Sequence, residues 1–198
     1  GLDDARAVAA MGEALASAHD VSAAAHLPAA LAARSAVPYV NEAGTAVTAL
    51  RVEGIGPSVE ARCRDLRNMF APLGDGEELH RMYSRQFWQE IRDAAPFAGD
   101  ARALWRISLP PAEGAKLVAA LGQSLIAEAY YDWAGGLVWL ALAAGEDASA
   151  DSVHAAVAAH GGHATLLRAP ADVRAAVAVF MPQAPAVAAL TKRLKESF

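Results

Sequence analysis

The residues best suited to chemistry in this chain of 198 residues lie in three short segments that we predict to be neighbouring strands. They are Tyr130-Tyr131-Asp132-Trp133 before a Gly-Gly turn, Trp105-Arg106, and His163–Arg168. Because side chains alternate along a strand, Tyr130 and Asp132 are expected on one face of the sheet, and Tyr131 and Trp133 on the other. A buried carboxylate needs a donor, and we expect Arg106 or Arg168 to supply it.

Two interpretations of this cluster stay open. One is a structural ion pair among core aromatic side chains, which is the more common role of buried pairs. The other is a polar, aromatic-lined wall that contacts a small ligand or a flat cofactor. For the second interpretation, the candidate residues facing substrate or flavin are Arg106, Asp132, Trp133, His163 and Arg168. No catalytic residue is assigned by the sequence.

Other catalytic and binding motifs are weak. Gly54-Ile55-Gly56 precedes a helix, but it lacks the third glycine and the distal acidic residue of a dinucleotide-binding loop. His154 and His160 are six residues apart and fall on different helix faces, so no metal site is predicted. The single cysteine, Cys63, is interpreted as a half-buried structural residue and not as a reactive thiol.

Composition excludes several classes of function. The net charge of −5 argues against nucleic acid as the main partner, since phosphate binding needs clustered Lys and Arg. No run of eighteen apolar residues is present, so no membrane span is predicted. The N-terminal residues lack the layout of a signal peptide. A lone cysteine fits a reducing compartment, and we expect a cytoplasmic protein.

The segments that must position the candidate residues form a repeated pattern. Ala103–Leu109, Glu128–Trp133, Leu137–Leu142 and His163–Arg168 are predicted strands, with helices from Pro111 to Gly122 and over Ala150–His160. This order is βαββαβ, the split ferredoxin-like motif.

Residues 2–94 look like the same unit without its opening strand. The predicted elements are helices at Gly1–Leu15, Val59–Phe70 (capped by Ser58) and Arg85–Ala94 (capped by Ser84), strands at Asp20–Leu27 and Thr45–Val52, an irregular Ala29–Gly44, and a short edge strand at Glu78–His80. A terminal helix is predicted over Pro185–Phe198.

The predicted fold is therefore α+β, with duplicated ferredoxin-like units whose antiparallel sheet is covered by helices. We divide the chain into a first, incomplete subdomain at residues 1–98, and a second subdomain with the C-terminal helix at 99–198.

Several of these segments resemble one known family. They resemble the C-terminal region of the FAD-binding E subunit of bacterial glycolate oxidase, a member of the FAD-linked oxidases of the vanillyl-alcohol-oxidase type. The resemblance spans most of the chain and is carried by Trp105-Arg106-Ile107-Ser108-Leu109-Pro110-Pro111, by Asp132–Leu140, Gly161–Arg168, Ser22–Pro28 and Arg51-Val52-Glu53-Gly54, and by the terminal Leu190–Phe198.

The resemblance implies a cap domain that covers the flavin and substrate side, while an N-terminal domain, absent from this chain, holds FAD. The expected activity is oxidation of glycolate to glyoxylate by a flavoprotein in a complex with a D-type flavoprotein subunit and an iron–sulfur subunit. The location implied is the cytoplasm, at the inner membrane through that complex. Residues 1–198 alone are expected to be inactive and colourless.

The chain departs from related caps in one respect. The D subunit and D-lactate dehydrogenases carry a His-x-Gly-Asp-Gly-Asn-x-His segment and a Glu-His pair, and neither occurs here. Two alternatives to a substrate-side cap therefore stay open: a non-catalytic assembly module of the same complex, and a free-standing ferredoxin-like domain for ligand binding or dimerisation.

Overall fold

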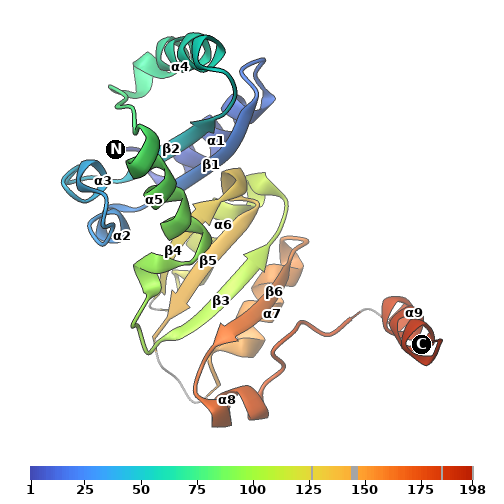
Figure 1. The fold of residues 1–198 in the computed structure, drawn as a ribbon. Helices are drawn as coiled ribbons and strands as arrows, with labels where there is room; N and C mark the ends of the chain where they lie inside the picture. The colour runs from blue at the N-terminus through green and yellow to red at the C-terminus, as the bar shows by residue number, and fades with distance from the viewer. Residues whose placement is uncertain (126, 144–146, 184, 198) are drawn as a thin grey trace.

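The computed structural model describes residues 1–125, 127–143, 147–183 and 185–197. Its strands form one six-stranded antiparallel sheet in the order β2-β1-β4-β5-β3-β6 (Figure 1). The strands are β1 Val21–Leu27, β2 Val47–Val52, β3 Ala103–Ser108, β4 Ala127–Asp132, β5 Leu137–Leu142 and β6 His163–Arg168. The α-helices are α1 Asp4–Ala16, α2 Ala29–Ala32, α3 Pro38–Asn41, α4 Gly56–Phe70, α5 Arg81–Arg92, α6 Gly114–Leu121, α7 Ala150–Ala159, α8 Ala171–Ala176 and α9 Pro185–Glu196. Short 3₁₀ turns are η1 Ala71–Leu73, η2 Ala95–Phe97, η3 Pro111–Glu113 and η4 Trp133–Gly135.

The second half of the chain is a complete ferredoxin-like unit. Its elements follow the order β3-α6-β4-β5-α7-β6, and its strands lie in the order β4-β5-β3-β6. Every neighbouring pair is antiparallel. The α+β prediction and the βαββαβ order are both confirmed.

The first half is the same unit in shortened form. It contains α1, the hairpin of β1 with β2, and then α4, with no opening strand before α1. Strand β1 also pairs with β4, through Ala25 opposite Asp132 and His26 opposite Tyr131. The two halves therefore share one continuous sheet, with their hairpins meeting at its middle.

Some local predictions are wrong. The edge strand predicted at Glu78–His80 is not formed, and among the described residues no strand lies beside it to supply hydrogen bonds. Ser58 and Ser84 lie inside helices and do not cap them, since α4 begins at Gly56 with Pro57 in its first turn, and α5 begins at Arg81. The region 29–44 is not irregular throughout but contains α2 and α3, and α8 was not predicted.

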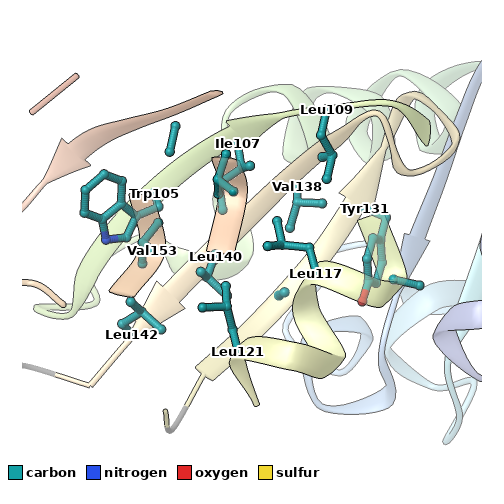
Figure 2. Close-up of a cluster of buried hydrophobic side chains, with 14 of the residues drawn as sticks. Trp105, Ile107, Leu109, Leu117, Leu121, Tyr131, Val138, Leu140, Leu142 and Val153 are labelled. Carbon is teal, nitrogen blue, oxygen red and sulfur yellow. The ribbon is translucent and has the colours of Figure 1, made fainter. Parts of the chain in front are cut away.

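The main core lies between one face of the sheet and helices α1, α6 and α7. Trp105, Ile107, Val138 and Leu140 point from the sheet toward Leu117 and Val153 of the helices (Figure 2). The indole N–H of Trp105 donates to the backbone oxygen of Ala148 at 3.1 Å, so this large side chain is buried without an unpaired polar atom.

A second apolar cluster covers part of the opposite face. Phe87 and Ile91 of α5 pack with Phe97 and Tyr130. The hydroxyl of Tyr130 donates to the carbonyl of Ile91 at 2.7 Å and fixes α5 to the sheet. Because α5 crosses only part of this face, the sheet beside it stays open (Figure 1).

The terminal helix α9 stands apart from the sheet at the end of an extended segment (Figure 1). Val187, Leu190 and Leu194 are each more than half exposed. The predicted contribution of Phe198 to this helix lies outside the described residues. In the part of the chain that the structure describes, there is no helix with the length and hydropathy needed to cross a membrane.

Candidate functional site

The open part of the sheet beside α5 forms a groove of about 580 Å³. Three of the five predicted site residues, Arg106, Asp132 and Trp133, line it together. Its full lining comes from β1, β2, β3, β4, β5, η4 and α5: Ala23, Arg51, Arg85, Trp88, Gln89, Ile91, Arg92, Arg106, Asp132, Trp133, Leu137 and Trp139. The groove is therefore a cationic and aromatic surface with one carboxylate in it.

Asp132 is the buried charge of the groove, with 8% of its surface exposed. The expectation that Arg106 or Arg168 donates to it is wrong. Its Oδ1 instead accepts the backbone N–H of Trp133 at 2.8 Å, and no ion pair to Asp132 occurs within the described residues. Burial raises the pKa of Asp132 above its ordinary 3.8, although the Trp133 N–H and the nearby charge of Arg106 act in the opposite direction.

Two of the four arginines in the groove are already paired. Arg92 makes a bidentate contact with Asp93, and Arg51 pairs with Glu53 at 2.9 Å. Over the described ranges, Arg85 and Arg106 make neither an ion pair nor a side-chain hydrogen bond. These two guanidinium groups are the cations of the groove that can bind an anion without breaking an existing contact.

Three tryptophans supply the aromatic part of the lining. Trp133 was expected on the opposite face from Asp132, and this prediction is wrong. Its φ of 50° takes it out of the strand alternation, and its 63% exposed side chain turns to the same groove as Asp132. Trp139 is buried and stacks on Tyr130, and its Nε1–H has no acceptor within the described structure.

A buried N–H without an acceptor is costly, and here it belongs to a residue that lines a cationic groove. Buried nitrogens of His26, His154 and Arg168 also have no hydrogen-bond partner in the described structure, and these residues lie outside the groove. The unpaired N–H of Trp139 is therefore not by itself evidence for a ligand.

The structure does not bring Arg168 and His163 into this groove. Arg168 donates to the backbone oxygens of Phe97 at 2.8 Å and Arg102 at 3.3 Å, so it fastens β6 to the segment before β3. His163 is exposed at the start of β6, opposite Ser108. Both residues therefore lie outside the candidate site.

The sequence interpretation missed the contribution of α5. Arg85, Trp88, Gln89 and Arg92 follow the spacing i, i+3, i+4, i+7, which places them on one helix face, while the buried residues of α5 occupy another. This spacing of polar and aromatic residues was the available signal. Nothing in the sequence indicated that this face lies over the strand that carries Asp132.

The buried charge of Asp132 predicts an unusual stability effect. Because folding raises its pKa above 3.8, the folded protein holds the proton more tightly, and stability falls as pH rises through the interval above 3.8. Asp132→Asn keeps an oxygen for the Trp133 N–H but removes the charge. We expect it to stabilise the protein by about 1 kcal/mol at pH 7 and to have no effect at pH 3, measured by urea unfolding. Equal destabilisation at both pH values would contradict the buried-charge account.

Asp4 lies on the other face of the sheet, and its pKa is lowered where that of Asp132 is raised. Asp4 Oδ2 accepts the hydroxyl of Tyr131 at 2.6 Å, and its Oδ1 lies 3.3 Å from Nε2 of His26, whose Nδ1 is 2.9 Å from Thr48 Oγ1. Burial raises the pKa of Asp4, but the contacts with His26 and Tyr131 outweigh it and hold the pKa below 3.8. Asp4 joins the first turn of α1 to β1 and β4.

For Asp4→Asn we therefore expect a loss of stability at pH 7. The loss is about 1 kcal/mol, because the Asp4 side chain is 39% exposed and solvent screens its charge. Since the native pKa is depressed, the contribution of Asp4 is present above pH 3.8 and is lost as the pH falls below it. Chemical unfolding at pH 7 and pH 3 measures both variants in one experiment, and a stabilising effect of Asp4→Asn at pH 7 would refute this assignment.

What the groove can do chemically follows from these contacts. Arg106 and Arg85 offer N–H donors and positive charge, and Asp132 offers a carboxylate with a raised pKa. This set matches a small organic acid, whose carboxylate the donors bind while a neighbouring polar group faces Asp132. No protein-family model matches the chain, and no match was found among curated proteins.

Proposed function

We propose that this chain is the substrate-side cap of a flavin-linked 2-hydroxy-acid oxidoreductase, and that its groove binds the carboxylate of the acid. The proposal joins the family resemblance of the sequence to the groove on the sheet. The observation that carries it is the presence of Arg85 and Arg106, which have no ion pair in the described structure, in one groove with the buried carboxylate of Asp132. Glycolate is the acid that the resemblance implies.

In this proposal the arginines bind and orient the acid. Arg106 lies opposite Trp139 in the β3–β5 ladder, so its guanidinium extends from the same face of the sheet as the Trp139 ring. A bidentate guanidinium–carboxylate contact fixes the plane of the acid as well as its position. Trp133, at the rim, shields the bound acid from water.

Asp132 lies on the far side of β5 from Arg106, on the neighbouring strand β4. The Trp133 N–H occupies Oδ1, which leaves Oδ2 to accept a hydrogen bond from the hydroxyl of the acid. A carboxylate whose pKa is raised by burial is also a stronger proton acceptor than an exposed one.

The residues of the groove fit the ring end of a flavin and not its nucleotide end. Trp88, Trp133 and Trp139 line the groove with flat aromatic rings, against which a flat ring system can pack. When bound, FAD supplies the acceptor for the hydride that leaves the acid. The FAD-binding domain expected from the resemblance would hold the adenine and phosphates.

The test is anaerobic reduction of the full-length flavoprotein by glycolate, followed by the flavin absorbance. We expect glycolate to bleach the flavin of the wild-type protein and Arg106→Lys to raise the glycolate concentration for half-maximal reduction about tenfold, because the variant keeps the charge and removes the bidentate donor. The proposal fails if the purified full-length protein carries no flavin, or if Arg106→Lys leaves the glycolate dependence unchanged.

The assembly-module alternative is favoured by one observation, the exposed apolar face of α9. Val187, Leu190 and Leu194 share this face and are more than half exposed. Replacing all three with serine would prevent co-purification of the other subunits under this alternative. Under the cap proposal, the same variant keeps glycolate binding in the groove.

A further inference from the structure

The turn η4, which joins β4 to β5, holds three consecutive residues in the left-handed region of backbone conformation. Their φ values are 50° at Trp133, 54° at Ala134 and 92° at Gly135. Glycine adopts this conformation freely, but a residue with a Cβ meets a steric penalty in it. Two non-glycine residues in a row are therefore strained, directly beside the groove. Strain of this kind persists only where the surrounding structure imposes it.

The packing of the turn against the start of α6 imposes this conformation. Ala134 is 1% exposed and belongs to the main core. A Cβ on Gly114 would lie 2.3 Å from the carbonyl oxygen of Gly135, and a Cβ on Gly135 would lie 2.7 Å from that of Pro111. The core side of the turn therefore has room only for small residues. The indole ring of Trp133 is directed to the groove side.

The side chain of Trp133 contributes little to folding. It is 63% exposed, and among the described residues its indole N–H makes no hydrogen bond and its ring makes no aromatic pair. Its contact with Asp132 uses the backbone N–H, which any residue except proline supplies. A large apolar side chain thus occupies a backbone position that favours glycine or asparagine, and it stays largely exposed there. Its effect is to be sought in the groove.

In the groove, the Trp133 ring lies beside the atom that we assign to the hydroxyl of the acid. Trp133 and Asp132 are adjacent in the chain and both line the groove. With the carboxylate of the acid on Arg106 and its hydroxyl on Asp132 Oδ2, the carbon that bears the hydroxyl faces the Trp133 ring. Glycolate carries only hydrogen atoms on that carbon. Any larger substituent there competes with the indole ring for the same space.

We propose that Trp133 is a specificity-determining residue of the groove, and that its ring restricts the substrate to short 2-hydroxy acids without a bulky substituent at carbon 2. This inference rests on the proposed function. The left-handed conformation turns the ring toward Asp132, whereas an extended residue at position 133 would direct it to the core face of the sheet. A smaller residue that tolerates this conformation relaxes the strain and opens the groove. Selectivity and stability therefore change in opposite directions.

The test compares the full-length flavoprotein with its Trp133→Asn variant, using a dye as electron acceptor. The substrates are glycolate and racemic mandelate, whose carbon 2 carries a phenyl ring. We expect the ratio of kcat/KM for glycolate to that for mandelate to fall at least tenfold in the variant, because mandelate gains access. We also expect the urea midpoint to rise by about 0.5 M, because asparagine tolerates the left-handed conformation.

Phe180→Asn is the matched control. Phe180 is also aromatic and is 69% exposed, but it does not line the groove. We expect Phe180→Asn to leave the ratio of kcat/KM values within twofold of that of the wild-type protein. A fall in the ratio in both variants would show a general effect of losing an exposed aromatic ring, and would overturn the assignment to Trp133.

Two further results would overturn the proposal. In Trp133→Asn, a ratio within twofold of the wild-type value would show that the ring does not limit the substrate, and a lower urea midpoint would show that it serves the fold. Both results leave oxidation of glycolate by the wild-type protein intact. If the wild-type protein does not oxidise glycolate, the proposed function fails and this inference fails with it, so the wild-type measurement separates the two failures.

Discussion

Replacing Arg106 with alanine is expected to weaken binding of glycolate about 100-fold, with little change in stability. Arg106 makes no ion pair or side-chain hydrogen bond within the described structure, so folding loses little when it is removed. A charged bidentate contact with a bound carboxylate is worth about 2 to 3 kcal/mol, which corresponds to about two orders of magnitude in Kd. Isothermal titration calorimetry with glycolate measures the loss directly, on the full-length protein.

Arg168→Ala is the matched control. This side chain donates to the carbonyls of Phe97 and Arg102, outside the groove. We expect Arg168→Ala to reduce the free energy of unfolding by about 1 to 3 kcal/mol while leaving the Kd for glycolate unchanged. If Arg168→Ala weakened glycolate binding and Arg106→Ala did not, the assignment of the anion site would be wrong.

The second large effect is expected at Gly114, where α6 begins against the η4 turn. A Cβ on Gly114 would lie 2.3 Å from the carbonyl oxygen of Gly135, which is closer than any tolerated contact. Relief requires movement of backbone, and the turn is itself constrained by Gly135 at a φ of +92°. We expect Gly114→Ala to destabilise the protein by about 3 kcal/mol, measured by urea unfolding.

The same substitution tests whether this contact positions the groove. The η4 turn carries Trp133, whose N–H holds Asp132. Displacement of the η4 turn is expected to weaken glycolate binding and also to reduce the free energy of unfolding. Gly12→Ala is the control, because a Cβ there meets nothing within 4 Å and alanine favours the helix by about 1 kcal/mol. A neutral Gly114→Ala would show that the turn and α6 are not in tight contact.

Secondary structure was predicted correctly where the local sequence pattern and the tertiary structure favour the same element. The βαββαβ unit follows from apolar alternation and from glycine turns, and each predicted strand of that unit lies within one residue of its observed position. The strand at Glu78–His80 had the pattern but not the partner, because strand formation depends on pairing that local sequence does not encode.

The candidate site was predictable only in part, for the same reason. Arg106 and Asp132 were placed together because the strand of Arg106 was expected to neighbour the hairpin that contains Asp132, and β3 does pair with β5 of that hairpin. Trp133 was assigned to the wrong face, since alternation stops where its φ becomes positive. Arg168 was assigned a ligand role because its strand was expected to lie beside the others, and only the fold shows that its guanidinium donates to the backbone carbonyls of Phe97 and Arg102.

The most direct measurement is a crystal structure of the full-length protein with flavin and glycolate bound. We predict that the glycolate carboxylate contacts Arg106, with the hydroxyl toward Asp132 and the flavin ring over the groove. Glycolate and flavin bound elsewhere, with this groove facing solvent or filled by another part of the chain, would contradict it.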